Sequence, residues 1–158
     1  MQIITGMKMY IGSKIVGAKP MDRKEYNDFR GWGMPKDEDG TDEGYLVQYQ
    51  DGYISWCPKT QFEDANRKTS GLSFGLALEA LKKGHKVARK GWNGKDMFLF
   101  LVPGSTFKVN RPPLLGIYEE GKEIDYHAHI DMKTVDNKVV PWLASQTDML
   151  SDDWLIID

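Results

Sequence analysis

The chain has 158 residues, enough for one domain or two small ones and too few for a barrel enzyme. Hydrophobic residues make up 41% and charged residues 28%, values typical of a folded protein with a packed core. No apolar run approaches the roughly 18 residues of a membrane span and the first residues do not resemble a signal peptide, so we expect a cytoplasmic protein without a membrane partner.

Cysteine content and net charge argue against disulfide-stabilised proteins, zinc fingers and binders of nucleic-acid polymers. A single cysteine cannot form a disulfide within the chain, and three histidines supply no zinc-finger spacing. The formal net charge of −2 argues against an electrostatic binder of nucleic-acid polymers. However, residues 80–111 carry eight basic side chains and one acidic one, whereas residues 112–158 carry three basic and ten acidic ones. This segregation favours a compact anion site.

A polar, turn-forming segment divides the chain near residue 70. Residues 67–71 read Arg-Lys-Thr-Ser-Gly, and a good helix start follows directly. We therefore predict an N-terminal module of unknown function over residues 1–70 and a second domain over residues 71–158.

The N-terminal module is predicted to be a separate small α/β unit. Asp22 fits an N-cap, and Glu25 three residues later completes the pattern of a capping box. Asp51-Gly52 between two apolar runs indicates a tight hairpin. In chain order, the expected elements are a strand at residues 9–16, a helix at 22–30, a loop at 31–44, strands at 44–49 and 53–56, and a helix beginning at Pro58.

The second domain is predicted to have an α+β fold, in which a small antiparallel sheet packs on one amphipathic helix. Ser73 fits the N-cap of that helix, whose apolar residues recur at helical spacing until Gly84. Residues 103–121 show no clear period and are expected to form a long loop of functional interest. Strands are expected at residues 86–89, 97–102, 127–133, 138–140 and 154–157, with a turn at 91–94 and a short helix at 145–150.

Three common catalytic motifs are absent from the sequence. There is no phosphate-binding Gly-x-x-x-x-Gly-Lys-Ser/Thr loop, no Gly-x-Gly-x-x-Gly and no His-Glu-x-x-His. Cys57 has no neighbouring histidine and is interpreted as a structural thiol. We therefore expect neither an enzyme nor a cofactor.

Residues 125–131 hold the one pattern that a metal ion could use. If the segment is a single strand, Asp125, His127, His129 and Asp131 share one face. Any half-exposed strand shows the same alternation, so we predict no metal site and keep His127 and His129 only as candidate ligands.

The turn at residues 91–94 could bind a nucleotide. Trp92 lies between glycines beside Arg89, where an indole can stack on a base and a cation can meet a phosphate. Asn93 adds an amide. A packing role for Trp92 over the sheet accounts for the same pattern.

Two further motifs offer groups that bind anions or hydroxyls. Arg111 stands beside Pro113 in the long loop, where a merely solvated loop is the alternative. A helix expected near residue 145 has free N–H groups that favour anions, with Gln146 and Thr147 in its first turn; an ordinary cap is the alternative.

Short sequence blocks follow one another in order along the second domain. They are Leu72-Ser73-Phe74-Gly75, residues 77–81, residues 87–94, Phe98-Leu99, residues 110–114, residues 130–132, residues 141–150 and Asp153-Trp154. Together, over about residues 72–158, they resemble the second type of phage Thoeris anti-defence protein. Residues 1–70 depart from that pattern, because compact members begin near Leu72; this extra module resembles small phage proteins of unknown function.

The resemblance implies a sponge for a nucleotide signal. Such proteins bind glycocyclic ADP-ribose, made by bacterial Toll/interleukin-receptor defence enzymes, in the cytoplasm of the infected host and do not cleave it. It also implies a homotetramer with pockets at subunit interfaces and, in some relatives, a separate site for cyclic dinucleotides. An aromatic face, cations and amides suit this ligand. The candidate ligand-binding residues are Trp92, Asn93, Arg89, Arg111, Pro113, Gln146, Thr147 and Asp148.

Two alternatives from other classes stay open. One is an enzyme that hydrolyses the same nucleotide, with the face of residues 125–131 as its metal or acid/base site. The other is a structural or host-protein-binding module in which tryptophans anchor an interface. Independently of the resemblance, large apolar residues in excess of one small core favour a homo-oligomer. These residues are Phe98, Phe100, Trp142 and Trp154.

Overall fold

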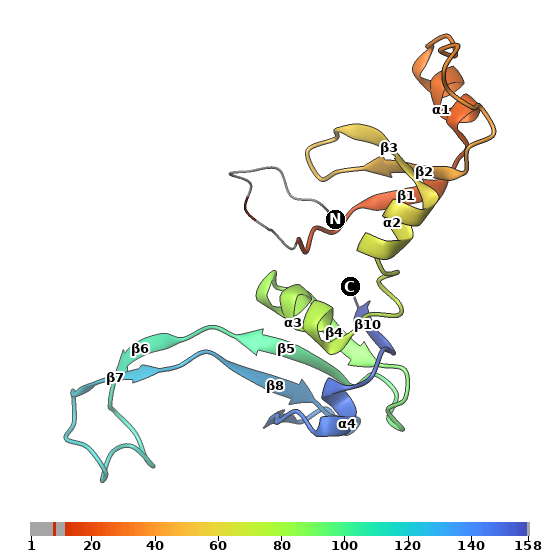
Figure 1. Cartoon of the computed structure of the whole chain (residues 1–158). Coiled ribbons are helices and arrows are strands. Elements are labelled where there is room, and N and C mark those ends of the chain that lie inside the picture. The colour runs from red at the N-terminus through yellow and green to blue at the C-terminus, as the bar shows by residue number, and fades with distance from the viewer. Residues whose placement is uncertain (1–7, 9–11, 158) are drawn as a thin grey trace. The chain divides into compact units, whose positions relative to one another are not determined.

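The computed structural model describes residues 8 and 12–157 and shows short helices with antiparallel sheets, the α+β class predicted from the sequence (Figure 1). The chain divides into two compact units, Met1–Arg67 and Lys68–Asp158. Within the described residues, no helix has both the length and the hydropathy needed to cross a bilayer.

The first unit contains one three-stranded antiparallel sheet in the order β1-β2-β3. Asp22 caps the first helix and Glu25 bonds back to it, so the predicted capping box is confirmed. The hairpin around Asp51-Gly52 is also confirmed. The elements are β1 (Gly17–Pro20), α1 (Arg23–Arg30), β2 (Gly44–Gln48), β3 (Ile54–Pro58) and α2 (Lys59–Ala65).

Several boundaries in this unit differ from the prediction, most of them by one or two residues. Residues 9–11 of the strand expected at 9–16 lie outside the described residues, and residues 12–16 form no strand. The strand that pairs with β2 is β1, in which Pro20 lies opposite Tyr45. Proline fits there because β1 is an edge strand, where a missing donor costs no ladder bond. Pro58 ends β3, and α2 begins one residue later than expected.

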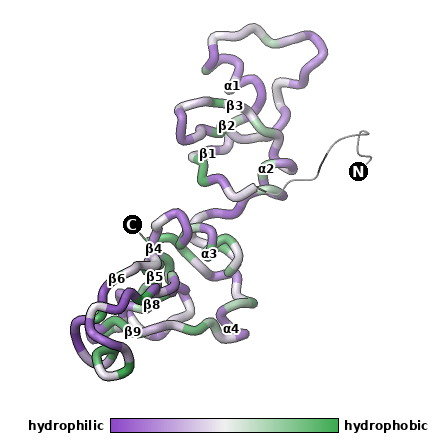
Figure 2. The backbone as a smooth tube through the Cα atoms, turned by 90° about the vertical axis from the view of Figure 1, so that its left-hand side faces the viewer, coloured by the Kyte–Doolittle hydropathy of each residue, from purple (hydrophilic) through white to green (hydrophobic). Residues whose placement is uncertain are grey.

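The second unit is built on a five-stranded antiparallel sheet in the order β10-β4-β5-β8-β9. One face of this sheet packs on α3, as predicted, and buries Leu81, Val87, Leu99 and Trp154 completely. In Figure 2, several hydrophobic stretches lie around α3, β4 and β5. The elements are α3 (Phe74–Lys82), β4 (Lys86–Arg89), β5 (Phe98–Val102), β8 (His129–Lys133), β9 (Val139–Pro141), α4 (Gln146–Met149) and β10 (Trp154–Ile157).

The segment expected to be a long loop contains a strand. β6 (Ser105–Lys108) pairs with β7 (Glu123–Tyr126) in a separate two-stranded sheet. We call residues 103–128 the arm; in Figure 1 it continues beyond β5 and β8, away from α4. At the base of the arm its outgoing and returning segments approach each other closely, since a Cβ on Gly104 would lie 2.9 Å from the Tyr126 carbonyl oxygen. Only glycine permits this approach. The sequence did not predict β6, because Pro103-Gly104 interrupts the strand pattern between β5 and β6.

Candidate functional site

A cluster of aromatic rings lies where α3, α4 and the sheet meet. Trp154 is fully buried at its centre, and the half-buried rings of Trp92 and Trp142 both approach it edge-on, at 5.6 Å and 6.1 Å between centroids. Phe74 of α3 contacts both Trp142 and Trp154. Trp92 therefore packs on the core, as the packing interpretation expects, while part of its ring stays accessible.

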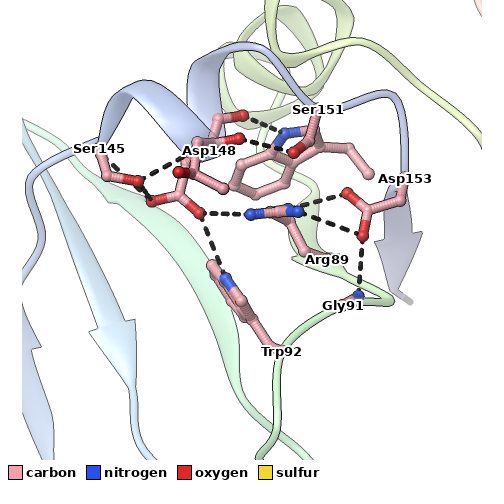
Figure 3. Close-up of polar contacts among 9 residues, drawn as sticks. Arg89, Gly91, Trp92, Ser145, Asp148, Ser151 and Asp153 are labelled. Carbon is pink, nitrogen blue, oxygen red and sulfur yellow. Dashed lines mark hydrogen bonds and ion pairs between the residues drawn. The ribbon is translucent and has the colours of Figure 1, made fainter.

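Arg89 lies between two carboxylates, one on α4 and one directly before β10 (Figure 3). Its Nε donates to Asp153 Oδ1 at 2.8 Å, and one terminal nitrogen donates to Asp148 Oδ1 at 2.9 Å. The second terminal nitrogen is 3.4 Å from Asp153 Oδ2. Only 13% of the Arg89 side chain is exposed. We call Arg89, Asp148 and Asp153 the arginine clamp.

The clamp is tied to the turn that carries Trp92. Asp153 Oδ2 accepts the backbone N–H of Gly91 at 2.8 Å, and Asp148 Oδ1 accepts the indole N–H of Trp92 at 3.4 Å. A Cβ on Gly91 would lie 2.9 Å from Asp153 Oδ2, so the turn approaches Asp153 this closely only because residue 91 is glycine.

The start of α4 is satisfied by its own capping box. Ser145 Oγ accepts the backbone N–H of Asp148, and Asp148 Oδ2 accepts from both the hydroxyl and the backbone N–H of Ser145. Gln146 and Thr147 are exposed in the first turn. The predicted helix start is confirmed, and its geometry is that of an ordinary cap.

The electrostatics of the clamp keep all three groups charged. The hydrogen bond from Arg89 holds the pKa of Asp153 below its usual value, and the bond to Asp153 raises the pKa of Arg89. Burial pushes the pKa of Asp148 up, but bonds from Ser145 and Arg89 outweigh burial and leave that pKa lowered. One cation thus faces two anions in a partly buried place.

Arg111 and Pro113 lie elsewhere, in an open hollow of about 580 Å³ at the end of the arm. Neither Trp92 nor any residue of the arginine clamp lines this hollow, so the described structure does not bring Arg111 and Pro113 beside Trp92 within one chain. The hollow is lined by Phe107, Lys108, Val109, Asn110, Arg111, Pro112, Pro113, Leu114 and Tyr126.

The candidate residues thus form two groups in one chain. The first group gathers at the clamp and comprises Arg89, Trp92 and Asp148, with the exposed Asn93 following Trp92 and Gln146 and Thr147 on α4. The second is the arm hollow with Arg111 and Pro113.

The single strand considered for residues 125–131 does not form. Residues 127 and 128 separate β7 from β8, and the two strands pair with different partners. Asp125 accepts from the Thr106 hydroxyl, whereas His129 Nε2 lies 3.7 Å from Asp131 Oδ2. Among the described residues, no three Asp, Glu, His or Cys side chains form a group that could hold a metal ion.

Sequence reasoning missed Asp153 and Ser145. The Ser145-x-x-Asp148 spacing is itself a capping-box pattern and could have identified the contact between Ser145 and Asp148. Asp153 carries no local sign of its partner, because Arg89 stands 64 positions earlier and meets it only through the pairing of β4 with β10.

Comparison with known proteins links this second unit to a family. The family model for the Thoeris anti-defense 2-like domain matches residues 72–157. A relative from Bacillus phage SP01, named Thoeris anti-defense 2, is 45% identical over 86 residues, which make up 54% of this chain and 94% of the relative. The matched residues include both the arginine clamp and the arm.

Proposed function

Because the chain belongs to the Thoeris anti-defense 2-like family, we propose that it acts against Thoeris defence as a sponge that binds glycocyclic ADP-ribose and does not cleave it. In this proposal, the protein works in the cytoplasm of the infected bacterium and lowers the concentration of free signal there. Its partner is this small molecule, not a nucleic-acid polymer or a membrane.

The observation that carries the proposal is the half-buried Trp92 indole held beside exposed polar groups. A nucleotide offers a base for stacking and ribose hydroxyls for hydrogen bonds. Trp92 supplies an aromatic surface, while Asn93 in the turn and Gln146 and Thr147 on α4 supply amides and a hydroxyl. These groups favour binding and include no general acid or base aligned with a nucleophile.

The phosphates are proposed to meet the arm of a neighbouring subunit. Arg111 and Pro113 cannot complete the Trp92 site of their own chain, because the arm extends away from it. A two-stranded ribbon is only marginally stable alone. In the single chain, the arm also leaves apolar residues exposed to solvent: the exposed fractions of Phe107, Ile117 and Tyr126 are 36%, 68% and 47%. Packing against a second copy would cover these side chains and bring Arg111 to a pocket at the interface.

The outer face of the five-stranded sheet supports the same assembly. Phe98 and Phe100 alternate with core residues of β5 and so point away from α3, which leaves them without a covering helix. Beside Phe100, Asp131 Oδ1 is buried and has no hydrogen-bond partner among the described residues. A second copy on this face would bury the rings and could supply a donor, as expected for a homotetramer.

One experiment separates a sponge from a hydrolase. Purified protein is incubated with glycocyclic ADP-ribose, recovered free of unbound ligand and denatured by heat, and the released molecule is identified by mass spectrometry. Intact ligand is expected. A hydrolysed product would establish the enzyme alternative, and absence of any retained ligand would refute the proposed function.

The second site for cyclic dinucleotides is part of the proposal and has its own test. Glycocyclic ADP-ribose binding is measured by calorimetry with and without a saturating cyclic dinucleotide. Independent binding of both ligands is expected. Competition between the two ligands would place both at one site. If titration with the dinucleotide gives no heat of binding, the proposed second site is refuted.

A further inference from the structure

We infer that Arg89 is a positioning residue for Trp92 and does not contact the ligand's phosphates, and that it acts through Asp153, which holds the Gly91 backbone, together with Asp148, which holds the indole. This inference rests on the proposed function. It assigns a role to Asp153 and gives Arg89 a different role from the phosphate contact expected from sequence.

Three of the five N–H donors of Arg89 are already in use. Its Nε and both terminal nitrogens are directed at carboxylate oxygens of Asp153 and Asp148, and little of the side chain reaches the surface. A guanidinium has five N–H donors in a fixed plane, so the donors engaged here cannot turn toward a ligand without breaking the clamp.

The charge of the clamp also disfavours a phosphate. Arg89 contributes one positive charge, and Asp148 and Asp153 contribute two negative ones with lowered pKa values. A pyrophosphate that approached Arg89 would also approach these carboxylates, whose oxygens lie 2.8 Å and 2.9 Å from Arg89 nitrogens, and like charges at close range repel.

The clamp reaches the binding surface through two hydrogen bonds. Asp153 holds the backbone of Gly91 directly before Trp92, while Asp148 holds the indole N–H at the far edge of the ring. Trp154 fixes the plane of the ring by its edge-on contact and is itself anchored, because its indole N–H donates to the Asp148 carbonyl oxygen at 2.9 Å. Trp92 is thus held in one orientation before the ligand arrives, which reduces the entropy lost on binding.

The two possible roles of Arg89 predict different effects of Asp153→Asn on ligand affinity. If Arg89 bound phosphate, removal of a competing carboxylate would leave the affinity unchanged or raise it. If Arg89 positions Trp92, the same change loosens the turn and lowers the affinity.

The experiment measures glycocyclic ADP-ribose affinity by calorimetry for the full chain. The variants are Asp153→Asn, Arg89→Lys and, as a surface control, Lys138→Gln in the β8–β9 hairpin, whose side chain is 74% exposed. We expect about tenfold weaker binding for Asp153→Asn and Arg89→Lys. Lys138→Gln should bind as the parent does.

Unchanged or tighter binding by a folded Asp153→Asn variant would overturn the inference. If that variant does not fold, Arg89→Lys decides, since lysine keeps the charge but lacks the planar fork whose separate nitrogens reach Asp153 and Asp148. Parental affinity in Arg89→Lys would show that the fork geometry is not needed and would overturn the inference. Failure of the parent itself to bind would instead refute the proposed function.

Discussion

The side chain of Trp92 is where the proposed binding energy is concentrated. Stacking of a base on an aromatic ring contributes about 1–3 kcal/mol. Trp92→Ala should therefore weaken glycocyclic ADP-ribose binding about ten- to a hundredfold, as measured by calorimetry. The matched control is Trp32→Ala, which removes a 51% exposed indole from the first unit and should change nothing. Equal affinity of a folded Trp92→Ala variant and the parent would exclude this turn as the pocket.

The clamp also makes stability depend on pH at the residue scale. The pKa of Asp153 is lowered in the folded protein, so its contribution is present above the unfolded value near 3.8 and is lost as pH falls through the folded value. At pH 7, Asp153→Asn should unfold at a lower urea concentration than the parent. Below pH 3.8 this difference should shrink, because the carboxylate is then mostly protonated in the unfolded parent and unfolding takes up a proton. A difference of equal size at pH 7 and below pH 3.8 would contradict the ion pair.

At the scale of elements, local signals were sufficient where neighbours in sequence make the structure. The capping box of Asp22 and Glu25 and the Asp51-Gly52 hairpin each arise from residues a few positions apart, and both are confirmed. β6 was missed because its pairing with β7 lies across the tip of the arm and its own residues show no alternation of burial. The contact between Arg89 and Asp153 was missed because the two residues are 64 positions apart and only the pairing of β4 with β10 brings them together.

The two helices of the second unit both begin after a serine, and the two serines are predicted to contribute differently to stability. Ser145 caps α4 through its hydroxyl, whereas the Ser73 side chain makes no capping hydrogen bond at the start of α3. Ser145→Ala should therefore lower the free energy of unfolding by about 1 kcal/mol, and Ser73→Ala by clearly less. Urea unfolding of both variants measures the difference. Equal losses would mean that the cap of α4 contributes nothing of its own.

For the whole molecule, the division into two units predicts that the second can act alone. The chain splits at Arg67 and Lys68, and the matched 86 residues account for 94% of the phage relative, which thus has little beyond this unit. A fragment of residues 68–158 should fold cooperatively and bind glycocyclic ADP-ribose with the affinity of the full chain. Calorimetry and thermal unfolding test this. Loss of binding by a folded, assembled fragment would show that the first unit contributes to the site.

The proposed assembly makes binding and oligomeric state inseparable. Light scattering at micromolar concentration should give four times the 18.0 kDa mass of one chain. Ile117→Asp places a charge on an arm residue that is 68% exposed in the single chain, so it should leave the fold intact and dissociate the assembly. Because Arg111 would then leave the neighbouring pocket, binding should fall together with the mass.

Tyr53→Asp is the matched control, since Tyr53 is 63% exposed but lies in the first unit, and this variant should keep both the mass and the affinity of the parent. If Ile117→Asp becomes monomeric and still binds with parental affinity, the site is complete in one subunit. Arg111 would then have no part in it, and the Trp92 turn would have to bind the phosphates with groups of its own chain.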